Sequence, residues 1–224
     1  MLGLDSATRR AAVGAIDGNR VLAEEAVFAQ SSHAASLPPL IEATLARASW
    51  TMRDLDIIAV SIGPGSFSGL RVGLSLAKGM AYALGIPLVP VPTLEALARS
   101  IDDASGVICP VLDARKGELY AAAFTASATR WQRLLDDTLL TPDALLQVLP
   151  TPCTVIGDAV PVYGELLTAR LGGAVRLLPF ETFAPRGATV ARLGMERLRA
   201  GNFPALDALE PFYIRPSDAE KKAS

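Results

Sequence analysis

Residues 57–73 read Ile-Ile-Ala-Val-Ser-Ile-Gly-Pro-Gly-Ser-Phe-Ser-Gly-Leu-Arg-Val-Gly, and this stretch decides the fold class. Its opening run is apolar apart from Ser61, which indicates a strand buried on both faces of a sheet. After the glycines, the spacing of apolar residues predicts a long helix over Ser66–Leu84 that ends at Gly85. A buried strand that leads through a short turn into a helix is typical of a parallel sheet, so we expect an α/β protein.

The segments around this stretch extend the pattern. Met1–Leu4, Ala11–Ile16 and Val21–Phe28 are apolar runs joined by short polar turns, which predicts three antiparallel strands. A helix is expected over Leu37–Ala48 and a further strand over Leu88–Val91. Three antiparallel strands followed by parallel βα units is the order of ribonuclease-H-like domains, including each half of the actin and sugar-kinase fold.

A second set of strands and helices follows. Val107–Leu112 and Leu119–Phe124 are predicted strands on either side of the charged turn 113–118, and helices are expected over Thr141–Leu149 and Gly187–Arg199. No internal sequence repeat is visible. We therefore predict an N-terminal ribonuclease-H-like lobe over residues 1–103, a smaller C-terminal α/β lobe over 104–216 whose last segment can pack back on the first lobe, and a tail over 217–224.

Composition limits the chemistry that this chain can perform. Of 224 residues, 50% are hydrophobic and 20% are charged, which favours a packed core over disorder. The net charge of −2 predicts no strong attraction to nucleic acid or to a membrane surface, and no apolar run is long enough to span a bilayer. A single histidine, His33, excludes a histidine-rich zinc site. We expect a cytoplasmic protein with two buried free thiols, Cys109 and Cys153.

The glycine-rich stretch resembles a phosphate-binding loop, because it lies between a strand and a helix. A Walker A loop that starts at Gly63 requires glycine at position 68 and lysine at 69, where this chain has Ser68 and Gly69. A dinucleotide fingerprint fails at Ser68 as well. Asp5 and Ser6, in the first hairpin, stay open as nucleotide contacts, with a turn-forming Asp/Ser pair as the alternative.

Small residues recur along the predicted helix that follows. Gly69, Gly73, Ala77 and Ala81 are four residues apart and therefore share one helix face. Such a face lets another backbone come close. The partner can be the protein's own sheet, or it can be a helix of another subunit, and the sequence leaves both alternatives open.

Three segments of this sequence carry a family resemblance: the glycine-rich stretch Gly63–Gly73, the charged motif Asp113–Tyr120 and a C-terminal segment. Together they resemble the TsaB (YeaZ) family of bacterial proteins for tRNA threonylcarbamoyladenosine synthesis. The third segment is Pro211-Phe212-Tyr213-Ile214-Arg215, and the resemblance extends from residue 1 to about residue 216. The family's usual threonine is replaced by Ser68. The signature residues are Gly63, Pro64, Gly65, Ser66, Phe67, Gly69, Arg71 and Gly73 in the first motif, and Asp113, Arg115, Glu118 and Tyr120 in the second.

The resemblance implies a two-lobed actin-like ATPase fold, with tandem ribonuclease-H-like domains and a reduced second lobe. It implies a non-catalytic partner and activator of TsaD, the paralogue that forms N6-threonylcarbamoyladenosine at position 37 of ANN-decoding tRNAs. TsaD carries a His-x-x-x-His metal site, and the matching stretch here runs from Thr93 to Leu97, neither of which is an imidazole ligand. We therefore expect no catalytic residue and no metal site in this chain.

Partners and interface are also implied by the resemblance. The chain is expected to bind TsaD as a heterodimer, to act with the ATPase TsaE, to form a homodimer when alone, and to contact tRNA only indirectly. No tightly bound cofactor is expected, with ATP or ADP entering only in the complex. The residues that the resemblance and the small-residue face assign to the interface are Leu37, Leu40, Ile41, Leu70, Gly73, Leu74, Ala77, Met80 and Ala81.

Two enzymatic alternatives stay open. A small ATP-dependent phosphotransferase of the actin-like superfamily is disfavoured by the short second lobe and by the absence of an evident carboxylate pair for Mg²⁺. A metallopeptidase is disfavoured because the imidazole ligands are missing.

Overall fold

The computed structural model describes residues 1–29, 32–102, 104–127, 130–179, 186–201 and 203–215. The chain divides into two compact units, each of which is described by itself. Unit 1 comprises Met1–Ala96 and Pro185–Phe212, and unit 2 comprises Leu97–Ala184 and Tyr213–Ser224. In the structure the chain passes from unit 1 to unit 2 between Ala96 and Leu97, inside the short helix α3 (Thr93–Ala98). The boundary predicted at residue 103 lies a few residues later.

Unit 1 contains a five-stranded sheet in the order β3-β2-β1-β4-β5. Strands β1, β2 and β3 are antiparallel neighbours, whereas β4 is parallel to both β1 and β5. This is the strand order expected of a ribonuclease-H-like domain, so the predicted fold class is confirmed. The strands are β1 (Leu2–Asp5), β2 (Arg10–Asp17), β3 (Arg20–Phe28), β4 (Ile58–Gly63) and β5 (Leu88–Pro92).

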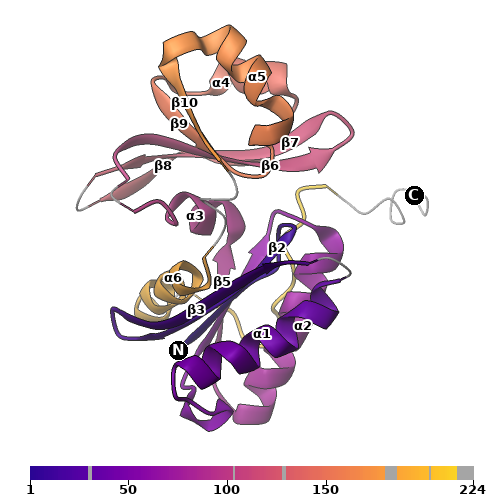
Figure 1. Ribbon diagram of the computed structural model, residues 1–224, viewed down its shortest axis with the longest axis vertical. Helices are drawn as coiled ribbons and strands as arrows, with labels where there is room; N and C mark the ends of the chain where they lie inside the picture. Colours follow the sequence, from indigo (N-terminus) through magenta and orange to yellow (C-terminus); the bar gives the residue numbers. More distant parts are fainter. Residues whose placement is uncertain (30–31, 103, 128–129, 180–185, 202, 216–224) are drawn as a thin grey trace. The chain divides into compact units, whose positions relative to one another are not determined.

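Helices α1 (His33–Arg47) and α2 (Phe67–Leu84) cover one face of this sheet, as Figure 1 shows. Their buried side chains join those of the strands in one apolar core. Helix α1 begins four residues before the predicted start, because the Ser32 hydroxyl accepts a hydrogen bond from Ala35 N and caps the helix there. A short 3₁₀ helix, η1 (Met52–Asp54), precedes β4.

Helix α6 (Gly187–Arg199) covers the opposite face of the same sheet. A Cβ atom at Gly14 would overlap the amide nitrogen of Ala188, so helix and strand meet backbone to backbone. Glu24 on β3 also accepts a hydrogen bond from Ala188 N at 2.9 Å, which satisfies an otherwise unpaired amide at the helix start. These contacts place residues 185–212 with unit 1, whereas the sequence-based division counted them in the second lobe and allowed its last segment to pack back on the first.

Unit 2 repeats the architecture of unit 1. Its five-stranded sheet has the order β10-β9-β6-β7-β8, with β6, β7 and β8 antiparallel and with β9 parallel to both β6 and β10. Read from the opposite edge, this is the strand order of unit 1. The strands are β6 (Gly106–Arg115), β7 (Glu118–Ala126), β8 (Trp131–Leu140), β9 (Cys153–Ile156) and β10 (Val175–Leu178).

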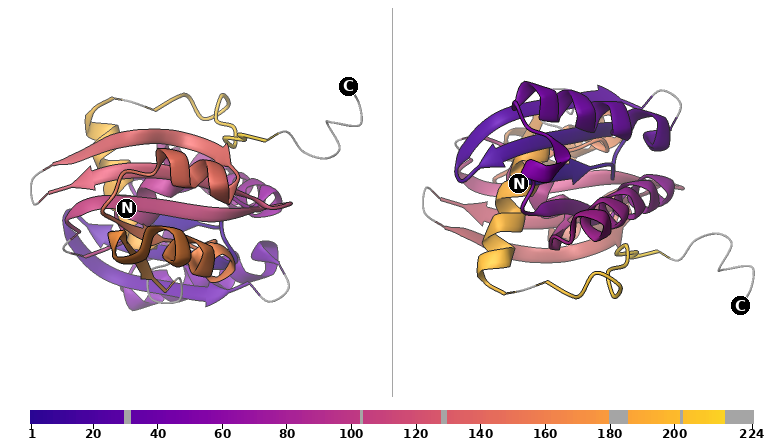
Figure 2. Two further views of the ribbon diagram at one scale, coloured as in Figure 1. Left: turned by 90° about the horizontal axis from the view of Figure 1, so that it is seen from above. Right: turned by 90° about the horizontal axis from the view of Figure 1, so that it is seen from below.

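Helices α4 (Pro142–Val148) and α5 (Val160–Leu171) of unit 2 are shorter than α1 and α2, which occupy the same places in unit 1. They have 7 and 12 residues, against 15 and 18 in α1 and α2, so the reduction of this lobe lies in its helices and not in its sheet. The view from above in Figure 2 shows α4 and α5 over the sheet. A 3₁₀ turn, η2 (Gly172–Ala174), leads from α5 into β10.

Three elements of unit 2 were not predicted from the sequence. Strand β8 alternates between half-buried and exposed residues, which is typical of an edge strand and gives a weak apolar signal. Helix α5 buries only Gly164 and Leu167 fully, and β10 is only four residues long. Each element is held in place mainly by its neighbours, which a single-sequence pattern cannot reveal.

Candidate functional site

The segment Gly63–Gly73, called the signature loop here, joins β4 to α2 in unit 1. Gly63 has φ of 126°, which strongly favours glycine, and its amide donates a 3.0 Å hydrogen bond to the Thr93 hydroxyl. One residue earlier, the Ile62 carbonyl accepts a 2.7 Å hydrogen bond from Phe212 N. The loop is therefore fastened on one side by the start of α3 and on the other by the C-terminal segment of unit 1.

The signature loop also packs on the turn between β1 and β2. Ser66 N donates to the Ala7 carbonyl at 2.7 Å, and the Ser6 hydroxyl donates to the Gly69 carbonyl at 2.8 Å. A Cβ atom at Gly69 would overlap the Ser6 carbonyl oxygen, and one at Gly73 would overlap the Ser6 hydroxyl. The glycines thus serve close packing inside unit 1, which was one of the two alternatives that the sequence left open.

The start of α2 is occupied by groups of the protein itself. The Ser66 hydroxyl accepts a hydrogen bond from Gly69 N at 3.3 Å and acts as the N-cap. Asp5 and Ser6 are 0% and 1% exposed, and Asp5 Oδ1 accepts from Ala7 N at 3.2 Å. These internal hydrogen bonds agree with the sequence, in which both phosphate-binding motifs fail at Ser68 or Gly69. A nucleotide contact by Asp5 and Ser6 stays a prediction.

His33 joins the start of α1 to the same turn. Its Nε2 lies 2.9 Å from the Thr8 carbonyl oxygen, so this nitrogen carries the proton and donates it. Burial lowers the pKa of His33, and the hydrogen bond to Thr8 opposes that effect. The histidine therefore serves as a tether between α1 and the turn, in a setting that disfavours its charged form.

The structure places most of the predicted interface residues inside unit 1. Met80 is partly buried, and the others are fully buried against the sheet, so they cannot form a surface while unit 1 keeps this conformation. This corrects the residue set, because the small-residue face of α2 turns toward β1 and β4. The fully buried members are Leu37, Leu40, Ile41, Leu70, Gly73, Leu74, Ala77 and Ala81.

The outer faces of the same helices remain accessible. On α2, four positions at helical spacing are exposed or partly exposed, and on α1 small and proline residues dominate the exposed side. Tyr82 is 82% exposed near the end of α2. The uncharged part of this outer face of α1 and α2 comprises Pro39, Ala43, Ala46, Val72, Leu76, Gly79 and Ala83, and the exposed side chains of Glu42, Arg47, Arg71 and Ser75 lie on the same two helices.

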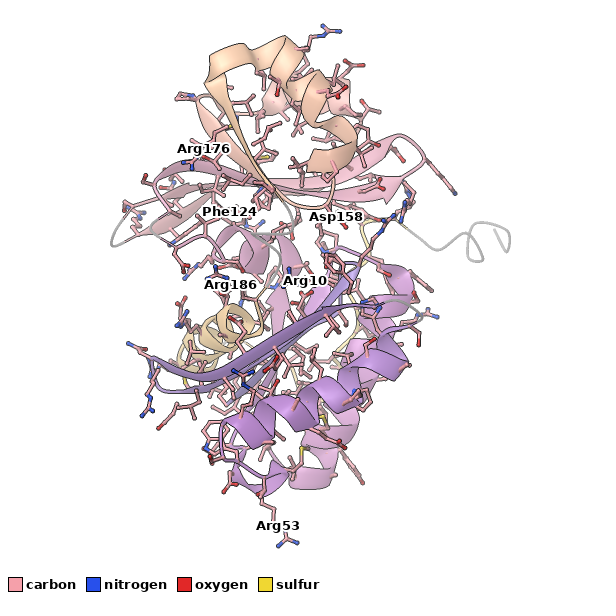
Figure 3. All side chains as sticks on the ribbon, viewed as in Figure 1. Arg10, Arg53, Phe124, Asp158, Arg176 and Arg186 are labelled. Carbon is pink, nitrogen blue, oxygen red and sulfur yellow. The ribbon has the colours of Figure 1, made fainter. Side chains whose placement is uncertain are left out.

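The second signature motif forms a hairpin in unit 2, called the charged hairpin here (Asp113–Glu118). Arg115 and Glu118 are paired across a two-residue turn, so the strands extend further into the motif than the predicted turn 113–118 allowed. Asp113 Oδ1 accepts from Arg115 N at 2.9 Å, and Asp158, which is labelled in Figure 3, accepts from Asp113 N at 2.9 Å. Arg215 forms an ion pair with Glu118 and donates to the Ala114 carbonyl at 2.8 Å.

Tyr120 lies beside this ion pair. Burial raises the pKa of Tyr120, the charge of Arg215 lowers it and the charge of Glu118 raises it. The role of Arg215 could not be predicted, because nearly a hundred residues separate it from the hairpin and no spacing rule links them. The only signal was its place in the C-terminal segment of the family resemblance.

Metal binding and a membrane span can be judged over the part of the chain that the structure describes. No group of three or more His, Cys, Asp or Glu side chains that could hold a metal ion was found in those residues. Within the same residues, no helix is long and apolar enough to cross a membrane. Cys109 and Cys153 are buried and unbridged, and burial raises the pKa of Cys153 to about 11, which disfavours a reactive thiolate.

Comparisons with known proteins agree with these observations. The family model described as "TsaD: tRNA N6-adenosine threonylcarbamoyltransferase" matches residues 26–162. The tRNA threonylcarbamoyladenosine biosynthesis protein TsaB of Bacillus subtilis is 27% identical over 225 residues, covering 99% of this chain and 96% of that protein. Its namesake in Haemophilus influenzae is 27% identical over 235 residues, with coverages of 99% and 96%.

Solved structures support the fold. A Pseudomonas aeruginosa protein described as similar to peptidase YEAZ has a TM-score of 0.79 and 22% identity, covering 96% of this chain and 98% of that one. Component A of (R)-2-hydroxyglutaryl-CoA dehydratase from Acidaminococcus fermentans has a TM-score of 0.53 and 8% identity, with coverages of 88% and 98%. At these identities the likeness concerns the fold alone.

Proposed function

Because this chain belongs to the TsaB (YeaZ) family, we propose that it is the non-catalytic partner and activator of TsaD. In this role it takes part in the synthesis of threonylcarbamoyladenosine at position 37 of ANN-decoding tRNAs. The names of the full-length relatives support the pathway. The role also implies a cytoplasmic protein.

The non-catalytic assignment rests on Thr93 and Leu97, the two positions that match the metal ligands of TsaD. Thr93 is 0% exposed, and its hydroxyl accepts the hydrogen bond from Gly63 N. Leu97 is 0% exposed as well. A hydroxyl that fastens the signature loop and a core leucine supply no imidazole to a metal, so these positions support a structural role.

We place the TsaD contact on the outer face of α1 and α2. The contact then uses the two helices that the resemblance implies. It is formed by their exposed residues, and not by the buried residues that the sequence predicted. The small and apolar side chains of its uncharged part allow a close approach between helices, and the exposed charges of Glu42, Arg47 and Arg71 are available for polar contacts with a partner. The same surface can pair two copies of the chain, so a homodimer would compete with the TsaD complex. TsaE would join as a further partner of the assembled pair.

A bulky charge in the middle of the outer face tests this assignment. Gly79 is exposed, and a Cβ atom there would meet nothing within 4 Å, so Gly79→Arg should fold normally. We expect it to abolish co-purification with TsaD and the stimulation of tRNA modification, because the charge would lose its water at the interface. Gly173→Arg in unit 2 is the matched control, since that glycine is equally open.

The control should bind and activate TsaD like the unchanged protein. Retained association by a folded Gly79→Arg variant would rule out this surface. If TsaD modifies tRNA equally well without this chain, the activator role itself is wrong.

For nucleotides, we propose that the isolated chain holds none tightly and that ATP or ADP enters only with the complex. The internal hydrogen bonds of Asp5 and Ser6 support this view. The alternative function, an ATP-dependent phosphotransferase, draws its support from the tandem sheets that this chain shares with actin-like proteins. ATP turnover by the purified chain alone would favour that alternative.

A further inference from the structure

The tip of the charged hairpin has an unusual backbone. Arg115, Lys116 and Gly117 have φ values of 62°, 57° and 77°, so three consecutive residues lie in the left-handed region. Glycine and asparagine adopt this region readily, and Asn-Gly is the preferred pair for such a two-residue turn. Arg115 and Lys116 are strained there because their Cβ atoms crowd the backbone. Strain of this kind is found where the side chains themselves are needed.

The surrounding contacts hold the strained tip in place. The Asp113 carboxylate accepts from Arg115 N and lies 3.3 Å from its guanidinium, while Asp158 fixes the backbone of Asp113. Arg215 links the two strands, because it donates to the Ala114 carbonyl on β6 and forms an ion pair with Glu118 on β7. The base of the hairpin is therefore rigid, and a ligand that meets the tip would find it preorganised.

The acidic groups face inward and the basic groups face outward. The side chain of Arg115 is 64% exposed, whereas those of Asp113 and Glu118 are 14% and 35% exposed. Lys116 and Gly117 are also exposed. What the tip presents to a partner is thus the Lys116 ammonium, a glycine and the Arg115 guanidinium, which is paired on one side with Asp113, although the chain as a whole has a net charge of −2.

The character of the tip favours a phosphate-bearing partner over a protein surface. No large apolar side chain of the described hairpin residues is exposed, while protein interfaces are built around apolar or aromatic anchors and are depleted in lysine. Arginine and lysine on a fixed turn are the usual contacts to a nucleic-acid backbone. We propose that Arg115 and Lys116 contact the phosphate backbone of the tRNA substrate. This inference rests on the proposed function. It differs from the expectation of a purely indirect tRNA contact, because it assigns one direct contact to the hairpin tip.

Asparagine substitutions test the proposal without damaging the fold. Arg115→Asn together with Lys116→Asn removes both charges and relieves the backbone, so the melting temperature should stay the same or rise. In the complex with TsaD, the affinity for an unmodified ANN-decoding tRNA transcript should fall. The slope of log affinity against log salt should become shallower by about one unit per lost phosphate contact. Arg115→Lys should keep most of the affinity, and Arg170→Gln on α5 is the control for a distant exposed charge.

The outcomes separate the hypotheses. Unchanged affinity and slope in a variant complex that still assembles would overturn the tip contact and leave the proposed function intact. Loss of TsaD or TsaE association at unchanged tRNA affinity would mean that the tip binds a protein. That result would also overturn the proposed tRNA contact. Loss of ATP binding alone would assign the tip to a free nucleotide instead. If the unchanged chain neither binds nor stimulates TsaD, both proposals fall together.

Discussion

The first hairpin of each unit occupies the same place in the repeated topology, yet the two hairpins have opposite surroundings. In unit 1 α2 covers most of the turn between β1 and β2: Asp5, Ser6 and Thr8 are at most 2% exposed, and Arg9 at its end is exposed. In unit 2 the turn between β6 and β7 presents Arg115 and Lys116 to solvent. The glycines of the signature loop allow α2 to lie directly on its turn, whereas in unit 2 Asp158, in the loop before α5, accepts a hydrogen bond from the backbone of Asp113 and leaves the hairpin tip exposed. The helix that follows the fourth strand therefore decides whether a turn is buried or presented.

One feature is common to both units, and its loss should have the largest effect. Gly63 is the last residue of the fourth strand of unit 1 and Gly157 directly follows that of unit 2, their φ angles are 126° and 130°, and a Cβ atom at either would overlap a backbone carbonyl oxygen. We expect Gly63→Ala and Gly157→Ala each to cost about 3 kcal/mol or more of unfolding free energy. Urea unfolding measures this loss. A loss below about 1 kcal/mol at either position would show that the two loops are not equivalent.

The covered turn of unit 1 should be sensitive to the size of residue 69. Gly69→Ala should cost about 2 kcal/mol, since the new methyl group would push α2 away from the Ser6 carbonyl. Gly79→Ala on the same helix is the matched control and should gain up to about 1 kcal/mol from helix propensity, because space there is open. Equal effects of the two substitutions in thermal unfolding would contradict the proposed close packing.

The presented hairpin of unit 2 should depend on Arg215. Arg215→Ala removes the hydrogen bond to Ala114 and the ion pair with Glu118, which we expect to cost about 1–2 kcal/mol after allowance for the partial exposure of Glu118. Glu118→Gln removes only the ion pair and should cost less. The difference between these two variants should persist in high salt, since the carbonyl contact is not an ion pair. If both variants lost the same unfolding free energy and high salt abolished both losses, the hydrogen bond from Arg215 to the Ala114 carbonyl would not contribute to stability.

The smallest effect concerns pH and belongs to unit 1. Burial lowers the pKa of His33 in the folded state, so the unfolded state binds its proton more readily. Stability should therefore be complete above the unfolded pKa of about 6.5 and should decrease as the pH falls below it. Comparison of urea unfolding at pH 7.5 and 5.5 for the unchanged protein and His33→Gln should show a smaller decrease in the variant. A steeper decrease in the variant would exclude this role.

Much of the fold could be read from the sequence because its signals are local. The continuous apolar run before Gly63 and the long helical spacing after Ser66 predicted a parallel βα unit, and unit 1 contains it as β4 and α2. The elements that were missed, β8 and α5, depend on neighbours that are distant in sequence. The duplicated Ile-Gly at positions 62–63 and 156–157 is too short to identify a repeat, and only the matching strand orders and φ angles make it visible.

By itself, the sequence determined the α/β class, the family and the absence of a histidine-rich metal site, because each depends on residue types and their spacing. Only the tertiary structure decided which side of α2 faces the core, where α6 belongs and how Arg215 fastens the charged hairpin. The physical reason is that both faces of α2 carry small and apolar residues. Composition alone therefore cannot tell the face that packs on the sheet from the face that remains exposed.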